Sequence, residues 1–191
     1  MRRIAVPVVA LAAAVLLSAS VAGAVDSATP TSSAVHSEVL IGAAGREMFV
    51  DSVYGFTIEY EQGFVVRSQA VSRSGPDATD LLASFHVMNP TMASGDLAGI
   101  EPPDLEIRIY DAGAAPTLKE WLVSAQFVSP QNERFGDSAR IEHVEGLKVC
   151  QSTMVAPGCS TFVLYRGRVY QLTPASLAGE SVMATFAFLA R

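Results

Sequence analysis

After residue 47, several segments of the chain have apolar and polar residues in alternation, with a period of two. In residues 56–60 and 105–110 every second side chain is apolar, which is the pattern of a strand with one buried face. The same alternation or short apolar runs predict further strands over residues 48–50, 64–66, 81–88, 139–144, 147–155, 161–166 and 168–173. Glu145-Gly146 and Gly167 mark tight reversals, so the second half is predicted to be an antiparallel meander.

Two segments have helical spacing instead. Thr117-Leu118-Lys119-Glu120 is a capping box, in which the threonine hydroxyl and the glutamate carboxylate satisfy free amides of the first turn. Apolar residues then recur at helical intervals and include the only tryptophan: Leu118, Trp121, Leu122, Ala125 and Val128. A second helix is predicted over residues 179–189. This order of elements predicts an α+β fold, with helices packed on an antiparallel β-sheet.

The run Tyr54-Gly55-Phe56-Thr57-Ile58-Glu59-Tyr60, followed by Gly63-Phe64, resembles the opening hairpin of the PsbP/Mog1-like fold family. Residues 117–122 resemble its central helix, and residues 181–188 resemble its C-terminal helix. One residue departs from the family pattern, because Glu61 stands where a proline is usual in the turn. The resemblance covers residues 47–189 and implies an antiparallel β-sheet flanked by helices, an α/β/α sandwich.

The resemblance also implies a class of function. Members of this family are non-enzymatic adaptor or assembly proteins that bind larger partners, such as a photosynthetic membrane complex or a small GTPase. Many bacterial relatives are exported proteins of unknown role. Nothing in this chain points to photosynthesis, and its N-terminus is incompatible with nuclear transport. The resemblance therefore implies an accessory protein that binds a protein or a cell-envelope component.

The N-terminus has the order of a secretory signal peptide. Arg2 and Arg3 precede an apolar run over residues 4–17, and Ala22-Gly23-Ala24 supplies small residues for cleavage near Val25. The alternative is an uncleaved anchor, because the apolar stretch is about long enough to span a bilayer. Residues 1–24 are thus predicted to be a leader that exports the protein to a periplasm or to the outside of the cell.

The remaining chain is predicted to form two parts. Residues 25–46 are rich in Ser, Ala, Thr and Gly without an apolar period, which indicates a flexible arm. Residues 47–191 are predicted to form a single domain. No segment after the leader is apolar for long enough to cross a membrane, so the mature form is not expected to span one.

The charge balance argues against one class of partner. The chain carries 13 basic and 19 acidic residues, a net charge of −6. Cleavage would remove Arg2 and Arg3 and leave a net charge of about −8. An acidic protein without a Lys/Arg cluster is repelled by phosphate backbones, so no nucleic-acid partner is expected.

Cys150 and Cys159 are the only cysteines. In an exported protein such a pair predicts a disulfide between neighbouring strands, and two buried free thiols are the alternative. A ring of this length stabilises the fold by roughly 2–3 kcal/mol in the chain-entropy model. The spacing is not CxxC, and two cysteines alone lack the further ligands that zinc needs.

The sequence offers little for catalysis. His86 lies within a predicted strand, where a histidine is usually a hydrogen-bonded filler, and His143 lies beside a turn. No spacing of a metal site is present, and no G-x-S-x-G or S-x-x-K motif supplies a serine nucleophile. No catalytic residue, metal or cofactor is therefore predicted.

Tyrosine and arginine mark a candidate interaction surface. Arg108 and Tyr110 share one face of a strand, and the last hairpin carries Tyr165, Arg166, Arg168 and Tyr170. These residue types combine contact area with directed hydrogen bonds, although arginine stems also cover apolar surface in ordinary sheets.

We therefore expect an exported, non-catalytic binding or accessory protein. One alternative is a small-ligand carrier with a pocket between the sheet and the Trp121 helix. Another is a hydrolase, which would need His86 or His143 beside a nucleophile.

Overall fold

The computed structural model of the chain describes residues 37–42, 45–69, 71, 80–94, 101–129, 136–152 and 157–190. The predicted leader, residues 1–24, lies outside these residues, as do residues 25–36 of the predicted arm. Within the described ranges, no helix is long and apolar enough to cross a membrane.

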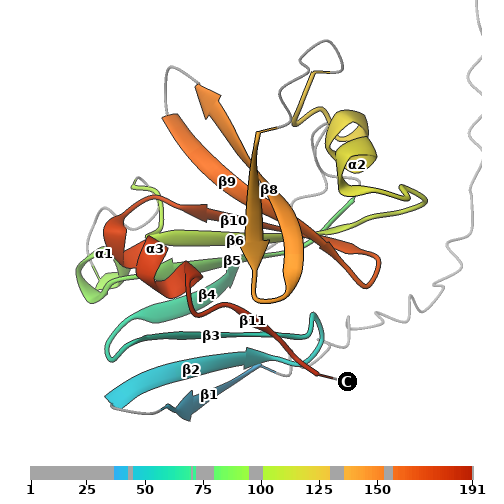
Figure 1. Ribbon diagram of the computed structural model, residues 1–191. Coiled ribbons are helices and arrows are strands. Elements are labelled where there is room, and N and C mark those ends of the chain that lie inside the picture. Colours follow the sequence, from blue (N-terminus) through green and yellow to red (C-terminus); the bar gives the residue numbers. More distant parts are fainter. Residues whose placement is uncertain are drawn as a thin grey trace, which may run out of the picture. The chain divides into compact units, whose positions relative to one another are not determined.

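The strands form two antiparallel sheets (Figure 1). The smaller sheet has the order β1-β2-β3-β11, with the bounds Ser37–Ile41, Arg46–Asp51, Phe56–Glu61 and Ala187–Phe188. The larger sheet has the order β4-β5-β6-β10-β9-β8-β7, with the bounds Val65–Gln69, Leu81–Met88, Leu105–Asp111, Arg168–Pro174, Pro157–Tyr165, Val144–Ser152 and Asp137–Ile141. The described helices are α1 (Pro90–Ser94), α2 (Leu118–Ser124) and α3 (Leu177–Met183). The predicted α+β fold class is confirmed.

The main core lies between the two sheets. β3 and β6 contribute the alternate apolar residues that the sequence pattern indicates: Phe56, Ile58, Tyr60, Leu105, Ile107 and Ile109. Each of these side chains is at most 1% exposed, and burial of an apolar side chain of this size contributes roughly 1.5–3 kcal/mol. The prediction had a single sheet, whereas the N-terminal hairpin packs as a layer of its own over the larger sheet.

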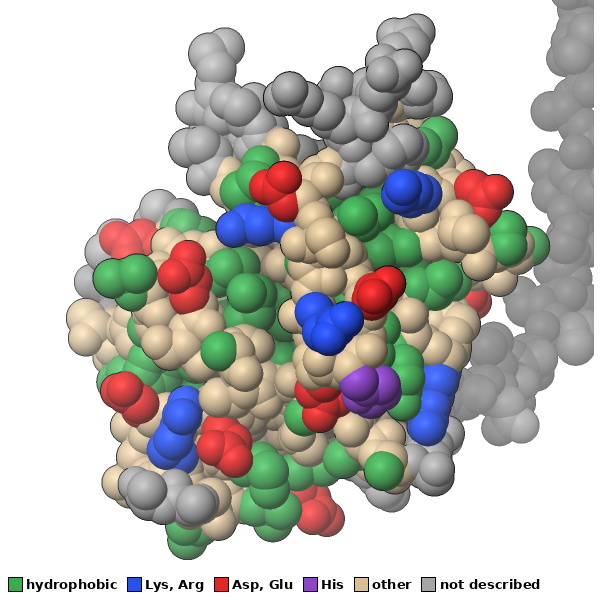
Figure 2. Space-filling view, in the orientation of Figure 1, with side chains coloured by type: hydrophobic (Ala, Val, Ile, Leu, Met, Phe, Trp, Pro, Cys, Tyr) green, Lys and Arg blue, Asp and Glu red, His purple; other side chains and the backbone are tan. Residues whose placement is uncertain are grey.

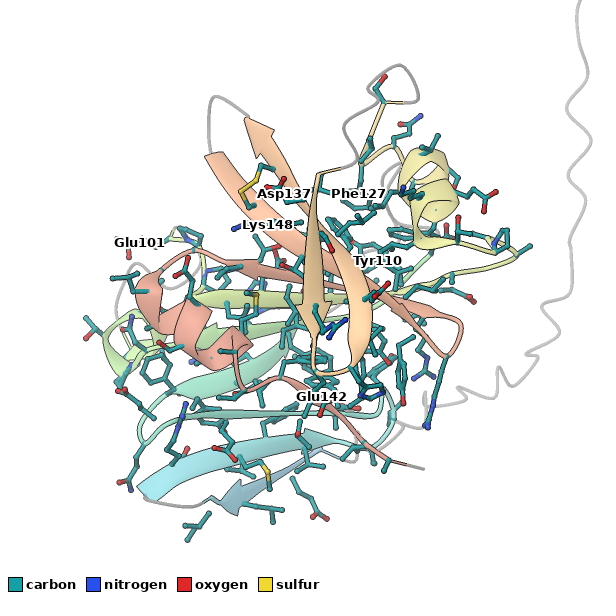
Figure 3. All side chains as sticks on the ribbon, viewed as in Figure 1. Glu101, Tyr110, Phe127, Asp137, Glu142 and Lys148 are labelled. Atoms are coloured by element: carbon teal, nitrogen blue, oxygen red, sulfur yellow. A yellow bond between two sulfur atoms is a disulfide. The ribbon has the colours of Figure 1, made fainter. Side chains whose placement is uncertain are left out.

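A second core lies on the other face of the larger sheet, under α2. The N-cap half of the predicted capping box forms, since the Glu120 N–H donates to Thr117 Oγ1 at 3.2 Å. The Glu120 carboxylate accepts the Thr117 hydroxyl at 2.6 Å instead of a backbone N–H. Trp121 is 2% exposed, and its indole N–H donates to a carbonyl of β6 at 3.2 Å. Figure 3 shows Tyr110 and Phe127 on this side of the sheet, next to α2.

The C-terminal helix is shorter and earlier than predicted. α3 begins after Ser176, whose hydroxyl accepts the Gly179 N–H at 3.0 Å, and it ends at Met183. Phe186 and Phe188 are buried on an extended segment, and β11 lies along β3 (Figure 1). Two buried aromatic residues two positions apart fit the period of a strand and not that of a helix.

A strand forms within the predicted arm. β1 pairs with β2 along its whole length, from Ser37 opposite Asp51 to Ile41 opposite Glu47. Four of its five side chains are exposed, so the strand is held mainly by backbone hydrogen bonds. Because its side chains need not be buried, its sequence has no apolar period. This is why composition indicated an arm at this position.

The β7–β8 turn also differs from its predicted place. It lies at Glu142-His143, and Gly146 is an internal residue of β8 opposite Val163. A Cβ at Gly146 would collide with the Phe162 carbonyl and the Val163 side chain. The glycine at this position permits the close approach of two strands and does not form a turn.

Cys150 and Cys159 face each other in register on β8 and β9 and form the predicted disulfide. The described part of the chain has no free cysteine. The disulfide ties the end of this hairpin that lies opposite to Tyr165, the last residue of β9.

Candidate functional site

The turn between β2 and β3 builds one wall of the candidate site. Asp51 accepts the Tyr54 N–H on its Oδ1 at 2.7 Å, and its carbonyl accepts the Gly55 N–H at 2.8 Å. Gly55 has a φ of 74°, a left-handed conformation that glycine adopts without steric cost. The Tyr54 hydroxyl donates to the Leu82 carbonyl at 3.0 Å, which fixes its ring beside the larger sheet.

The β9–β10 hairpin builds the opposite wall. Tyr165 and Arg168 are register partners, and Arg166-Gly167 is the two-residue turn between them. Both turn residues have positive φ, 50° and 73°, as a type I′ turn requires. This turn favours Asn or Gly at its first position, and a left-handed conformation costs other residues roughly 1–2 kcal/mol. Arg166 is therefore strained by its own position.

Two hydrogen bonds join these walls. The Tyr170 hydroxyl donates to the Tyr54 carbonyl at 2.6 Å, and Arg168 Nη1 donates to the Val53 carbonyl at 2.8 Å. Between the walls lies a cavity of about 140 Å³, lined by Tyr54, Gly55, Tyr165, Arg166, Arg168 and Tyr170. We name this set of residues the Tyr/Arg site.

Aromatic rings hold the two guanidinium groups of the site. The Arg166 guanidinium carbon lies 4.9 Å from the centre of the Tyr165 ring, and that of Arg168 lies 5.1 Å from the centre of the Tyr54 ring. The Tyr165 ring packs in turn on Phe188, with 4.1 Å between ring centres. No described carboxylate forms an ion pair with either arginine. Both cations are thus oriented by rings. Arg166 remains available to an anion, and Arg168 offers only the N–H groups that it does not use on the Val53 carbonyl.

The charges around the cavity follow from burial. Burial raises the pKa of Asp51, although the N–H groups of Tyr54 and Val53 and the charge of Arg168 act in the opposite direction. Among the described residues, Asp51 Oδ2 has no hydrogen-bond partner. Burial also raises the pKa of Tyr54 and of Tyr170, so both phenols stay protonated at neutral pH. The positive charge at the cavity therefore comes from the guanidinium groups.

Arg108 and Tyr110 lie on the opposite face of the larger sheet. In the β6–β10 pairing, Arg108 lies opposite Gln171, and Ile109 lies opposite Tyr170. Because successive side chains of a strand point to opposite faces, Arg108 and Tyr110 lie on the face opposite to Tyr170. Tyr110 is 3% exposed, and its hydroxyl donates to Gln171 Oε1 at 2.9 Å. The structure brings the four predicted residues of the last hairpin together and places Arg108 and Tyr110 elsewhere.

Arg108 belongs to a charged cluster with Glu106 and His86. Arg108 Nε donates to Glu106 Oε1 at 2.8 Å, and His86 Nε2 lies 3.4 Å from the same oxygen. Burial raises the pKa of Glu106, but the hydrogen bond from His86 and the charge of Arg108 outweigh burial and lower that pKa overall. No described hydroxyl hydrogen-bonds to His86.

His143 lies near the Tyr/Arg site instead. Its ring packs edge-on against Tyr165 with 6.2 Å between centres, and its Nδ1 lies 3.7 Å from Glu142 Oε2. Figure 3 labels Glu142, whose carboxylate accepts the Phe188 N–H at 3.0 Å. The His143 side chain is 71% exposed. Within the described chain, no group of His, Cys, Asp and Glu side chains could hold a metal ion.

The space between α2 and the sheet is a packed core. The centre of the Trp121 ring lies 5.1 Å from that of Tyr110 and 5.6 Å from that of Phe127. Phe162 lies beneath them, 5.0 Å from Phe127, and is 1% exposed. These side chains occupy the place where the small-ligand alternative put its pocket, and the Tyr/Arg cavity lies on the other face of the sheet.

Tyr54 and Gly55 line the cavity and were not among the predicted site residues. Both residues belong to the opening hairpin motif, so their pattern indicated structure and not binding. Tyr54 and Tyr170 are 116 positions apart in the chain. A Tyr-Gly pair in a turn beside a strand was the available signal, and only the tertiary fold shows which hairpin it meets.

No protein-family model matches the sequence, and no curated protein matches it. Among solved structures, the chain is similar to the solution structure of cyanobacterial PsbP (CyanoP) from Synechocystis sp. PCC 6803. The identity is 13%, the match covers 78% of this chain and 95% of that chain, and the TM-score is 0.43. This match assigns the chain no partner, ligand or activity.

Proposed function

We propose that this chain is an exported, non-catalytic binding protein that contacts a protein or cell-envelope component through the Tyr/Arg site. The observation that carries the proposal is the pair of arginines held against tyrosine rings at an open cavity. Arg166 is exposed, and within the described chain it has no carboxylate partner. An external group is thus the natural acceptor for its hydrogen bonds.

The site is built to bind at low entropic cost. The hydrogen bonds of Tyr170 and Arg168 to the β2–β3 turn fix both walls before a partner arrives. Preorganised tyrosine and arginine side chains lose little freedom on binding, which is why such residues dominate interface energetics. These features support a contact surface.

Cavity size favours a surface contact over a carrier. A cavity that encloses a drug-sized ligand has a volume of roughly 300–1,000 Å³. The cavity in the Tyr/Arg site, at about 140 Å³, has room for one chemical group of a larger molecule. On the face shown in Figure 2, basic and acidic side chains are interspersed among apolar ones, as in a mixed protein surface.

Export is the second part of the proposal. The leader pattern of residues 1–24 and the Cys150–Cys159 disulfide both support it, because disulfides persist in oxidising compartments. Fractionation of cells that make the full chain, with N-terminal sequencing of the product, tests it. We expect a product that starts near Val25 outside the cytoplasm, and an intact chain in the cytoplasm would contradict export.

The contact surface is tested by cross-linking in the native cells, followed by affinity capture and mass spectrometry. We expect a partner that is captured by the natural chain and lost with Arg166→Ala. Arg140→Ala is the matched control, because Arg140 is an exposed arginine on β7, 3.5 Å from Glu145, and is outside the site. Capture of the same partner at the same yield by Arg166→Ala would show that the site is not the contact surface.

A further inference from the structure

We propose that the Tyr/Arg site recognises a single carboxylate group on its partner, held between the guanidinium groups of Arg166 and Arg168. This inference rests on the proposed function and names the chemistry of the group that enters the cavity. Guanidinium donors form a planar fork that matches a carboxylate with two parallel hydrogen bonds. Arg166 and Arg168 both line one cavity of about 140 Å³, and Arg168 Nη1 already donates to the Val53 carbonyl, so Arg166 offers the complete fork.

The donors at the cavity select the anion. The hydroxyls of Tyr54 and Tyr170 already donate to the carbonyls of Leu82 and Tyr54, at 3.0 and 2.6 Å. Their rings therefore form apolar walls, and the guanidinium groups supply the polar recognition. A carboxylate with an apolar stem fits walls of this kind better than a fully polar ion does.

Nearby acidic groups limit the charge of the ligand. Asp51 is fully buried beneath the β2–β3 turn and acts electrostatically on Arg168 and Tyr170. The Glu142 carboxylate accepts the N–H of Phe188, and the Phe188 ring packs on Tyr165 in the wall of the site. The negative charge of Asp51 offsets part of the positive charge of Arg168, so a monoanion is favoured over a phosphate dianion.

The backbone at Arg166 supports a binding role for its side chain. Its φ of 50° places it in the first position of a type I′ turn, where Asn or Gly removes the strain. A long charged side chain at this position works against the stability of the turn. Its presence is explained if the guanidinium group contributes an interaction that Asn and Gly lack.

Because Arg166 is strained in the turn, a substitution at this position can remove the guanidinium group without lowering the stability of the fold. Arg166→Asn should melt at the same or a higher temperature than the natural chain, because it relieves the turn. Gln126→Asn is the matched control, since Gln126 has a φ of 62° after α2, is exposed and lies outside the site. Both variants relax a left-handed residue, and only Arg166→Asn removes a guanidinium group.

Isothermal titration of the purified protein then tests the inference. The probes are acetyl-Ala-Ala-Leu with a free C-terminal carboxylate, its C-terminal amide, and inorganic phosphate. We expect the carboxylate peptide to bind about tenfold or more tightly than the amide and than phosphate. Arg166→Asn should lose about tenfold in affinity, and Gln126→Asn should lose none.

Other outcomes overturn the inference in distinguishable ways. Equal binding of the carboxylate and the amide, tighter binding of phosphate, no binding of the peptide, or unchanged binding by Arg166→Asn would each contradict carboxylate recognition. If Arg166→Ala still loses its cellular partner in the capture experiment, the proposed function stands while the carboxylate inference fails. If the partner is retained as well, both fail.

Discussion

The two faces of the larger sheet carry the same pair of residue types in opposite roles. On the α2 face, Arg108 is bound to Glu106 at 2.8 Å, and the Tyr110 hydroxyl donates to a side chain of β10. On the other face, Arg166 and Arg168 lie on tyrosine rings and have no described carboxylate partner. Both clusters consist of arginine and tyrosine, but the arginine of the α2 face is paired with a carboxylate and, among the described residues, the arginines of the Tyr/Arg site are not.

This difference shows what distinguishes a binding site from an ordinary sheet position. Residues whose donors are satisfied inside the chain contribute to stability, because a partner would have to replace bonds that already exist. On the other face Arg168 already donates to the Val53 carbonyl, whereas Arg166 is oriented by a ring, has no described carboxylate partner and offers hydrogen bonds at little cost. The comparison therefore predicts that changes on the α2 face alter folding, and that changes at Arg166 alter binding.

The largest effect is expected from Trp121→Ala. The indole fills the core under α2 and donates to a carbonyl of β6, so its removal leaves a cavity and an unpaired acceptor. We expect a loss of about 3–5 kcal/mol in the free energy of unfolding. Urea denaturation followed by circular dichroism measures it, and a loss below about 1 kcal/mol would contradict a packed core at α2.

Removal of the disulfide should have the next largest effect. The double variant Cys150→Ser/Cys159→Ser is expected to lose about 2–3 kcal/mol in the free energy of unfolding. The disulfide lies at the far end of β9 from Tyr165, so the folded variant should bind a partner normally. Thermal melting with and without a reducing agent measures the first effect. If the double variant fails to bind the partner at a temperature where it is folded, the disulfide is not independent of the binding site.

Glu106→Gln tests the charged cluster of the α2 face. Because the pKa of Glu106 is lowered in the folded state, its ionised form stabilises the fold above its ordinary pKa of 4.5. That contribution disappears as the pH falls through the folded-state pKa. We expect the variant to be less stable by about 1–2 kcal/mol at pH 7. The difference in stability between the variant and the natural chain should disappear as the solution is acidified below pH 4.5. A difference that does not change with pH would contradict the ion pair.

Asp51→Asn should show the smallest effect and the opposite sign. Burial raises the pKa of Asp51, so the folded state loses stability as the pH rises from 3.8 through the raised value. Asparagine keeps an oxygen for the Tyr54 N–H and carries no charge. We expect a gain of less than about 1 kcal/mol at pH 7 that vanishes below pH 3.8. A melting series over pH measures this, and destabilisation at pH 7 would refute it.

Most of the strands and helix α2 could be predicted because their signals are local. Alternation located β3 and β6, and Thr117 and Glu120 located the start of α2. The turn of β7–β8 was misplaced because Gly146 serves the close approach of two strands, which the chain on its own does not show. β1 was missed because its pairing uses backbone atoms and exposed side chains.

The site was predicted in part for a similar reason. Tyr165, Arg166, Arg168 and Tyr170 are adjacent in the chain, so their grouping is visible in the sequence. Their separation from Arg108 depends on the register of β6 and β10, and the role of Tyr54 depends on the packing of one sheet on the other. Such long-range pairing has no local signature in a single sequence.

The most direct test compares Arg166→Ala with Arg108→Ala by two readouts, thermal melting and capture of the cellular partner. The account predicts that Arg166→Ala melts like the natural chain and loses the partner. It predicts that Arg108→Ala loses about 1–3 kcal/mol in the free energy of unfolding, since Glu106 is left without its arginine, and keeps the partner. Retention of the partner by Arg166→Ala, or its loss by folded Arg108→Ala, would contradict the account.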